Sequence, residues 1–560
     1  MTTTHRRAFG GVTAAALAIT LAACSTSGGN GAGGSGGGDG VDPADLEDNM
    51  VGAMEDYDVG TTFEATEPIE LPLLYRDHPN YPLQEDWMFF QELEENQNVT
   101  FDITSVPLSD WTQRRSVLVG AGDAPDIMPI TYAGDETQFV ASGTILPISD
   151  YVEYMPNFQQ KVEEWGLQEE IDQNRQADGK YYMIPGLHEQ PKPQYSIVIR
   201  QDLFEEAGIT EDPETWDEFA EQLQTVMDAH PELDYGFSDR WNLNGPMEAT
   251  LQAAAPNFGT NAGWGYGDGL TWQPESEEFV YTGAMDEYRS LLEYFHGLVE
   301  SGVMDPESVS QEDDPAIAKF TNGQSAAIGG NDQEILTYRQ NFEDAGVDAE
   351  LRLITVPAGP AGNISGTTRT ESGLMFASSA AESENFVAML QFVDWLYYSD
   401  EGLEFAKWGV EGETYNVGDD GTRTLVENID INGLNPGAPE ALNTDYGFHN
   451  GVFMPAHGST VDLVESMLRP EVIEFIDAMN QKEPAVIPPP IPFEEMEREE
   501  ASLHQQSLQD HVMQNTAQFI LGQRSFDEWD QYVTELEGQN MQQYVDMANE
   551  AYQRGFSEEE

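Results

Sequence analysis

Side chains that could support catalysis are spread along this chain without the spacing that catalysis requires. The nine histidines form no His-Glu-x-x-His pair for zinc. No nucleophile elbow of the Gly-x-Ser-x-Gly type stands between an expected strand and helix, and no Gly-x-x-x-x-Gly-Lys run could cradle a phosphate. With 102 aspartates and glutamates, a pair of carboxylates at glycosidase separation carries no information. These patterns do not call for an enzyme.

Aromatic residues outside periodic segments point instead to reversible binding. Trp264 and Tyr266 lie in the glycine-rich series 263–269, which is typical of a surface loop. A bulky ring there has no periodic core to join, so we expect both rings to stack on a ligand. Other tryptophans fall on helical stripes, and we expect them in the core: Trp87, Trp216, Trp395 and Trp529.

The only cysteine, Cys24, ends the run Leu-Ala-Ala-Cys behind two arginines and a short apolar stretch. This pattern is typical of a secretory signal over residues 1–23. The run resembles the bacterial lipobox, which implies cleavage before Cys24 and lipidation of its thiol; the alternative is an ordinary signal with a chance cysteine. Residues 5–9 also resemble a twin-arginine signal, the alternative being a plain charged n-region. We therefore expect an extracellular protein anchored to the cell membrane through lipidated Cys24.

The amino-acid composition narrows the class of protein further. A formal net charge of −79 repels nucleic acid and anionic lipid, and we interpret it as a solvated coat suited to salty or alkaline surroundings. Aromatic residues make up 10% of the chain, which argues against disorder. Once Cys24 is lipidated, no cysteine remains for a disulfide or a thiolate metal site. We expect residues 24–66 to form a flexible acidic and glycine-rich tether, with structure beginning near Ile69.

Hydrophobic periodicity predicts α/β layers. Short apolar runs predict strands over residues 69–74, 101–106, 126–130, 196–200 and 351–356. A capping box at Thr215 opens one expected helix, and a second ends at Gly302. Residues 379–382 are expected to cap a third helix, and residues 493–554 are almost wholly helical in pattern. In such layers ligands lie at the carboxyl ends of strands.

Six sequence elements in order resemble extracellular solute-binding proteins of ABC importers, the carbohydrate-type family 1. They are a Pro-Asp-Ile strand, an Asp-Gly-Lys-x-Tyr-x-x-Pro step, an Ile-Arg-x-Asp segment that leads into Pro-x-Thr-Trp-x-Glu-Phe, a Gly-x-x-Ala strand, and two later elements. These start at residues 125, 178, 199, 323, 409 and 519. The last two, Gly-x-Glu-Gly-x-x-Tyr and Phe-Ile-x-Gly followed by Trp-Asp-x-Tyr-Val, are similar to the LplA-like lipoprotein branch.

The resemblance implies a periplasmic-binding-protein type II fold, with two α/β lobes around a ligand cleft, crossing hinge strands and a helical C-terminal region. The expected lobes are 67–190 with 355–425, and 191–354 with 426–560. Such a monomer would capture an oligosaccharide and deliver it to an ABC permease. Two alternatives stay open: the same fold binding a peptide or a cationic solute, and a surface glycan-degrading enzyme.

Candidate ligand-binding residues are those just after strands, beside the crossings, or within the family elements. For the group at 76–78 the alternative is a capped turn, and for Trp408 and Glu411 it is a structural role. The candidates are Arg76, Asp77, His78, Tyr132, Asp135, His188, Glu189, Asp239, Arg240, Trp241, Trp264, Tyr266, Asn331, Glu371, Trp408 and Glu411.

Many oligosaccharide-binding relatives carry an acidic calcium loop after the Thr-Trp-x-Glu-Phe helix. Residues 228–235 of this chain lack the alternating oxygen ligands and the glycine that such a loop requires. We therefore expect no structural calcium at that place, and no cofactor.

Overall fold

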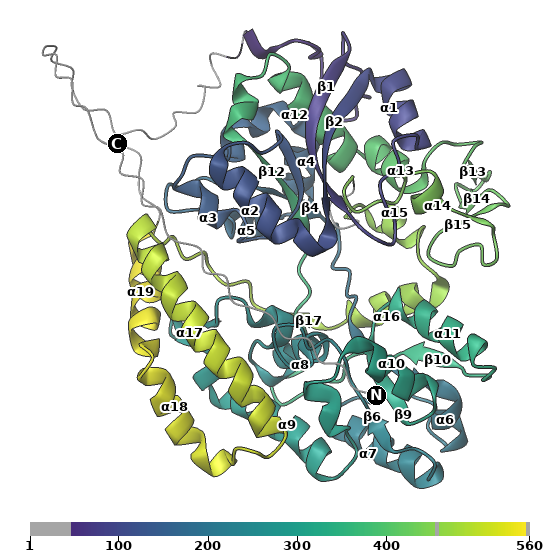
Figure 1. The fold of residues 1–560 in the computed structure, drawn as a ribbon, viewed down its shortest axis with the longest axis vertical. Helices are drawn as coiled ribbons and strands as arrows, with labels where there is room; N and C mark the ends of the chain where they lie inside the picture. Colours follow the sequence, from purple (N-terminus) through teal and green to yellow (C-terminus); the bar gives the residue numbers. More distant parts are fainter. Residues whose placement is uncertain (1–45, 47, 454–457, 556–560) are drawn as a thin grey trace, which may run out of the picture. The chain divides into compact units, whose positions relative to one another are not determined.

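The computed structural model describes residues 46, 48–453 and 458–555, which form two lobes with a sheet in each (Figure 1). The predicted signal, Cys24 and most of the predicted tether lie outside the described residues.

The first lobe is built on a five-stranded sheet in the order β2-β1-β3-β12-β4. The strands β1, β2 and β3 run parallel, whereas β12 is antiparallel to both β3 and β4. The carboxyl ends of β1 and β3 therefore meet at one edge, where Arg76 and Tyr132 are found. The strands are β1 (Ile69–Asp77), β2 (Val99–Pro107), β3 (Ile127–Thr131), β4 (Ile184–Leu187) and β12 (Thr370–Phe376).

Helices of the first lobe surround this sheet, and α12 packs against α4 and β4 as a wholly buried helix. They are α1 (Met88–Gln97), α2 (Trp111–Ala121), α3 (Thr137–Val140), α4 (Pro156–Glu164), α5 (Gln168–Asp172), α12 (Phe386–Tyr398), α13 (Asp400–Trp408), α14 (Leu442–Asp445) and α15 (Val461–Glu465).

The second lobe is built on a four-stranded sheet in the order β10-β5-β9-β6. Its strands are β5 (Ser196–Arg200), β6 (Tyr235–Phe237), β9 (Ser325–Gly330) and β10 (Leu351–Leu353). The expected strands of both lobes are confirmed within a few residues at their ends. The helices are α6 (Gln201–Glu206), α7 (Trp216–Ala229), α8 (Glu248–Phe258), α9 (Asp286–Glu300), α10 (Asp313–Thr321), α11 (Glu334–Asp344) and α16 (Pro470–Met479).

Local sequence signals set the bounds of α7 and α9. The Thr215 hydroxyl accepts a hydrogen bond from the Glu218 backbone N–H, as predicted for a capped start. The apolar face of α9 is buried, and the chain turns at Gly302 with φ of 77°. The cap predicted at 379–382 is wrong, because these residues form a separate 3-10 turn and α12 begins after Asn385.

Short strands complete the described chain. They form four two-stranded pairs, β7 with β8, β11 with β17, β13 with β14, and β15 with β16. Their bounds are β7 (Leu270–Gln273), β8 (Glu278–Tyr281), β11 (Ile364–Ser365), β13 (Tyr415–Val417), β14 (Arg423–Leu425), β15 (Ile429–Asp430), β16 (Glu440–Ala441) and β17 (Glu483–Pro484).

Three segments connect the lobes, and a hydrogen bond ties the first two to each other. Residues 188–195 join β4 to β5, residues 354–369 join β10 to β12, and the chain crosses a third time before α16. His188 N–H donates to the Arg369 carbonyl at 2.8 Å, and the Glu189 carboxylate accepts from the Val461 N–H at 2.8 Å. The first two crossings are thus bonded to each other, and the first is also bonded to the start of α15, so they are not independent linkers.

Packing places the lobe boundary later than the predicted residue 425. Ile429, Leu442, Phe448 and Met467 join the core of the first lobe, whereas Leu468 joins that of the second. The reason is non-local: aromatic and aliphatic side chains after β14 fill the space beside α1 and α13.

The end of the predicted tether is also wrong, because residues 48–66 are packed rather than loose. Phe63 is fully buried with an edge-to-face contact to Phe392, and the Tyr57 hydroxyl donates to Asp394 at 2.9 Å. One aromatic contact and one hydrogen bond to α12 thus hold this stretch in place despite its acidic composition.

The helical C-terminal region is confirmed as α17 (Glu495–Ile520), α18 (Trp529–Glu537) and α19 (Met541–Arg554), coloured yellow-green to yellow in Figure 1. These helices belong to the core of the second lobe. Arg498 of α17 also donates to the Thr137 carbonyl of the first lobe at 3.1 Å. Among the described residues, no helix is long and apolar enough to cross a membrane.

Candidate ligand-binding site

Three aromatic rings from separate segments meet where the first crossing enters the second lobe. Tyr195 ends that crossing, Trp241 follows β6, and Trp264 lies in the glycine-rich loop after α8. The ring centroid of Tyr195 is 5.6 Å from that of Trp241 and 5.1 Å from that of Trp264, and the two indoles are 5.5 Å apart. Trp264 remains 39% exposed. We call these three residues the ring cluster.

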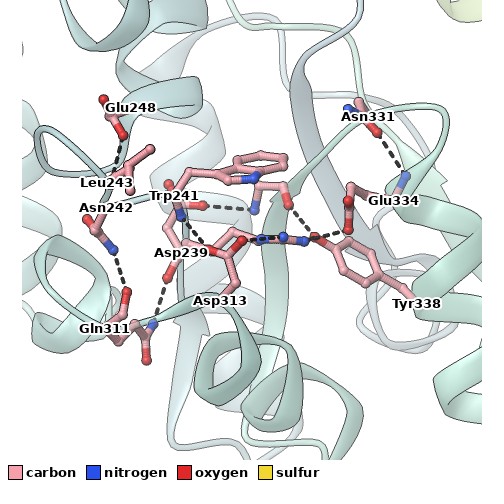
Figure 2. A network of polar contacts seen from close by, with 12 residues as sticks. Asp239, Trp241, Asn242, Leu243, Glu248, Gln311, Asp313, Asn331, Glu334 and Tyr338 are labelled. Atoms are coloured by element: carbon pink, nitrogen blue, oxygen red, sulfur yellow. Dashed lines mark hydrogen bonds and ion pairs between the residues drawn. The ribbon is translucent and has the colours of Figure 1, made fainter. Parts of the chain in front are cut away.

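The backbone at Trp241 is held in a conformation that a bulky residue rarely adopts. Its φ is 63°, in the left-handed region. The Trp241 N–H donates to the Asp313 carboxylate at 3.1 Å, and its carbonyl accepts from the Glu248 N–H at 2.9 Å. Figure 2 shows these contacts around the indole. Strain of this kind persists only where surrounding structure enforces it, and it gathers at functional sites.

Arg240 supports the Trp241 ring from the core side of the lobe. Its guanidinium carbon lies 4.5 Å from the indole centroid, and its nitrogens donate to Asp313, Glu334 and the Tyr338 hydroxyl. Burial alone would lower the pKa of Arg240, but the hydrogen bond to Asp313 and the neighbouring charge of Glu334 raise it. Arg240 is therefore a charged positioning residue for the ring.

Trp264 is positioned by a close backbone approach at the preceding glycine. Gly263 has φ of 57°, and a Cβ atom there would collide with the Glu248 carbonyl oxygen. Only glycine fits this place, and it fixes the direction in which the short 3-10 turn Gly263–Tyr266 leaves α8.

Polar groups of both lobes act on the pKa of the Tyr195 hydroxyl. Burial raises its pKa to about 12, with further increases from Tyr132 and Glu371 of the first lobe and Asp332 of the second. A hydrogen bond with Asn331 lowers it in part. Four polar residues, drawn from both lobes, thus act on one hydroxyl of the ring cluster.

Glu371 is held by the first crossing. Its Oε1 atom accepts from Gln194 Nε2 at 3.1 Å and lies 3.3 Å from His188 Nε2. The Glu371 side chain is 23% exposed, whereas that of His188 is 1% exposed. The carboxylate can therefore reach a ligand, and His188 orients it from behind.

A second group of candidates lies at the carboxyl end of β1. The His78 ring stacks on Tyr81 with centroids 4.7 Å apart. Burial raises the pKa of Tyr81, while the charge of Arg76 and a hydrogen bond with it lower that pKa in part. Tyr132, which is 54% exposed, is a charge neighbour of the hydroxyls of both Tyr81 and Tyr195.

These side chains suit reversible binding of a polyhydroxylated ligand. Flat rings pack against apolar faces, and the surrounding carboxylates, amide and hydroxyls can exchange hydrogen bonds with a hydroxyl rim.

The sequence model of the family described as bacterial extracellular solute-binding protein matches residues 80–402. The chain belongs to this family. The match includes the first crossing, all three rings of the cluster, and Glu371.

Relatives with assigned ligands are distant in sequence. The polygalacturonan/rhamnogalacturonan-binding protein YtcQ of Bacillus subtilis is 24% identical over 347 residues, which cover 60% of this chain and 65% of YtcQ. The fructooligosaccharide ABC transporter substrate-binding protein FusA of Streptococcus pneumoniae is 22% identical over 528 residues, or 88% of this chain and 92% of FusA.

Solved structures of this family share the fold. An HMO-binding solute-binding protein from Bifidobacterium longum infantis superimposes with a TM-score of 0.66 at 17% identity, over 87% of this chain and 99% of the other. The structure of FusA in complex with kestose superimposes with a TM-score of 0.62 at 18% identity, over 87% of this chain and 99% of the other. The two-lobed α/β arrangement is the type II fold of these proteins.

Several predicted residues of this solute-binding protein have other roles. Tyr266 is wrong as a stacking residue, because it is 2% exposed within the core of the second lobe. Trp408 is 1% exposed and donates to Ser466, so the structural alternative holds. Asp239 is fully buried; burial raises its pKa to about 6, and its Oδ1 accepts from the Gly329 N–H.

Other candidates are occupied by local contacts. Asp135 pairs with Arg115 at 2.6 Å, and Asp77 accepts from the Leu83 N–H at 3.0 Å, as the capped-turn alternative requires. Asn331 accepts from two N–H groups at the start of α11. Glu189 belongs to the bonded crossings, and Glu411 is exposed in the turn before β13.

Sequence reasoning missed Tyr195, Tyr81 and Gln194. Gln194 and Tyr195 lie in the first crossing and Tyr81 follows β1, so the signal that selected His188 and Tyr132, a place beside a crossing or after a strand, applies to them too. Tyr195 directly precedes β5 and lies just outside the strand predicted over residues 196–200.

A cavity of about 380 Å³ lies between β10, α11 and α16, and no residue of the ring cluster lines it. Its lining mixes Arg339, Arg352 and Glu471 with aliphatic side chains, and Asp332 borders it. Arg339 and Glu471 already form an ion pair there at 2.6 Å, so the chemistry favours the ring cluster as the ligand site.

The described residues contain no group of three or more potential metal ligands. In the segment 228–235, the Asp234 carboxylate accepts from Gln324 Nε2 at 2.9 Å, and His230 lies 3.1 Å from the Leu203 carbonyl. These side chains are engaged in joining α7 to its neighbours.

Proposed function

We propose that this solute-binding protein captures an oligosaccharide between its lobes and delivers it to the permease of an ABC importer. The observation that carries the proposal is the ring cluster of Tyr195, Trp241 and Trp264 beside polar groups from both lobes. Sugar rings offer apolar faces and hydroxyl rims, which match such a surface. The relatives YtcQ and FusA are named for saccharide ligands, which supports this class.

Closure of the lobes around the ligand would produce the form that the permease recognises. Hinge motions of this kind use a few residues between rigid bodies. The bonded crossings at His188, Glu189 and Arg369 would serve as that hinge. We propose that the protein works as a monomer and binds no nucleic acid, because its net charge of −79 opposes that partner.

A binding screen tests the proposal. The purified protein is titrated by calorimetry with fructo-, malto-, galacto- and xylo-oligosaccharides and with tri- and tetrapeptides. We expect at least one saccharide class to bind, with a change in tryptophan fluorescence that Trp264→Ala removes. Binding of peptides without any saccharide would support the alternative solute class instead.

We further propose that the protein performs no hydrolysis. A labelled oligosaccharide that binds should be recovered intact after prolonged incubation. Shorter labelled products, absent with a heat-denatured sample, would establish the glycan-degrading alternative.

The proposed anchor is lipid on Cys24, which would retain a freely diffusing binder at the cell surface. Stable attachment needs more than one acyl chain, and diacyl modification meets that need. Mass spectrometry of the membrane-extracted protein should show a lipid-modified N-terminal cysteine. Replacement Cys24→Ser should release the protein into the medium or leave its signal uncleaved, and unchanged membrane attachment would contradict the anchor.

A further inference from the structure

We infer that Leu243 forms a further ligand subsite beside the ring cluster, so that the site takes at least a trisaccharide. The inference rests on the proposed function and names the length of the ligand that the same site accepts.

Leu243 is an exposed apolar side chain on a firmly held backbone. It stands two residues after Trp241, in the segment between β6 and α8, and it is 86% exposed. No other large apolar side chain among the described residues has a larger exposed fraction. The Leu243 N–H donates to Glu248 Oε2 at 2.9 Å, and the Asn244 N–H donates to the same oxygen at 3.2 Å.

Asn242 fixes the same segment from its other side. Its Oδ1 accepts from the Met247 N–H at 2.9 Å. Its Nδ2 donates to the carbonyl of buried Gln311 at 2.8 Å (Figure 2). Single apolar side chains are common on protein surfaces and need no explanation by themselves. Here hydrogen bonds hold the backbone of the leucine in place before a ligand arrives, which lowers the cost of ordering it on binding.

One residue, Glu248, sets the position of Leu243 relative to both indoles. Its backbone N–H donates to the Trp241 carbonyl at 2.9 Å, and its carboxylate holds Leu243. Its carbonyl oxygen lies where a Cβ atom on Gly263 would collide, so the turn that carries Trp264 packs against it as well. Glu248 itself is 4% exposed. The two indoles and Leu243 are therefore positioned by a single buried residue at the start of α8.

The shape of these three surfaces sets the length of the ligand. The planes of Trp241 and Trp264 are inclined by 55°, so a single sugar ring cannot lie flat on both. Leu243 adds a third surface, which is apolar and can pack against the C–H groups of a sugar. Since each surface takes its own sugar unit, a ligand that covers all three needs at least three linked units.

Titration of one saccharide series at increasing length tests the inference. For the class that binds in the screen, calorimetry compares the disaccharide, the trisaccharide and the tetrasaccharide. We expect the trisaccharide to bind about tenfold more tightly than the disaccharide, because it gains the contact with Leu243. A disaccharide that binds as tightly as the trisaccharide would overturn the inference and leave the proposed function standing. If no saccharide of any length binds, both the proposed function and the inference fail.

A variant pair assigns the length preference to this leucine. Leu243→Ala should melt like the parent, because the side chain is exposed, and should lose about tenfold in affinity for the trisaccharide but none for the disaccharide. The matched control is Leu503→Ala on α17, where the leucine is 75% exposed; it should bind both saccharides like the parent. Unchanged trisaccharide affinity in Leu243→Ala would show that the leucine does not touch the ligand. An equal loss for both saccharides would contradict a separate subsite.

Glu248 offers a second test that leaves the leucine in place. Glu248→Gln keeps an acceptor oxygen for the N–H groups of Leu243 and Asn244, so we expect it to keep the preference for the trisaccharide. Glu248→Met removes the acceptor and frees the segment, so the preference should shrink although the leucine is still present. Circular dichroism checks that both variants are folded. A folded Glu248→Met variant with the full length preference would contradict the positioning of Leu243 by this carboxylate.

Discussion

The guanidinium of Arg240 lies against the Trp241 ring at 4.5 Å, and the two residues are adjacent in the chain. Neighbours in sequence stack in this way because Trp241 adopts φ of 63°, which turns its side chain back over the preceding residue. Asp313 then holds both partners, accepting from the Arg240 guanidinium and from the Trp241 N–H. One carboxylate thus couples the core of the second lobe to the proposed binding surface.

Replacing Arg240 should therefore damage both stability and binding. In Arg240→Met, two carboxylates lose their shared cation and the indole loses its support, so we expect a loss of about 2 kcal/mol in unfolding free energy. Urea unfolding at 25 °C measures this loss. The control Arg339→Met breaks a more exposed pair with Glu471 and should cost less than about 1 kcal/mol. Equal losses in the two variants would show that Arg240 is an ordinary surface cation.

Removing the Trp264 ring should weaken binding without unfolding the lobe. Because this ring is partly exposed, Trp264→Ala should leave the melting temperature nearly unchanged. The expected cost is about 1 kcal/mol or more in the affinity for the oligosaccharide found in the screen, and Trp264→Phe should restore part of it. Trp272→Ala is the control, since that ring packs on Phe279 and Tyr552; it should lower stability and spare affinity. Undiminished affinity in Trp264→Ala would remove this ring from the site.

The backbone at Trp241 offers a test that separates strain from function. Glycine adopts positive φ freely, whereas alanine there costs roughly 1 kcal/mol. Trp241→Gly should therefore be more stable than Trp241→Ala by about that amount, and both should lose saccharide binding. Differential scanning calorimetry and titration of the two variants provide the comparison. If alanine is as well tolerated as glycine, the left-handed conformation does not persist in solution.

The fold could be predicted from sequence where signals are local. The capping box at Thr215 and the apolar stripe of α9 act over a few residues, and both appear in the structure. The lobe boundary could not be predicted in this way, because Phe448 reaches the core of the first lobe by packing on Phe89, which lies far away in the sequence. No local pattern marks such pairing.

Within the site, the sequence could not predict which aromatic ring of the glycine-rich loop is exposed. Trp264 and Tyr266 stand two residues apart among glycines, yet the first is 39% exposed and the second 2%. The turn at Gly263 and packing of Tyr266 against Tyr288 decide which ring is buried. Glycine removes the steric preferences from which a side-chain direction could have been deduced.

Salt should stabilise this protein more than an ordinary one. At a formal net charge of −79, carboxylates repel one another across the folded surface, and counterions screen that repulsion. We expect the melting temperature to rise steadily as sodium chloride increases from low to molar concentration. Potassium chloride should raise the melting temperature as much as sodium chloride does, because the effect comes from charge screening rather than from a specific ion-binding site. A flat or falling melting temperature would contradict the interpretation of the surface as a salt-adapted coat.

Buried Glu136 should make stability fall as pH rises. Burial raises the pKa of Glu136 to about 7, although N–H donors of its own residue and Gly134 lower it in part, as does Arg498. The folded chain therefore keeps a proton that the unfolded chain releases near its ordinary pKa of 4.5. The stability from this proton is fully present below about pH 4.5 and is lost as pH rises through 7, a change on the order of 3 kcal/mol.

The isosteric variant Glu136→Gln removes this titration while preserving an acceptor for the Gly134 N–H. We expect urea unfolding between pH 5 and pH 8 to show a shallower decline for the variant, which should be the more stable protein at pH 8. The decline should not vanish, because burial also raises the pKa values of Asp239 and Asp394 to about 6. Exposed Glu163→Gln should follow the parent at every pH. Parallel curves for the parent and Glu136→Gln would mean that Glu136 is ionised in the folded state, with Arg498 compensating its charge.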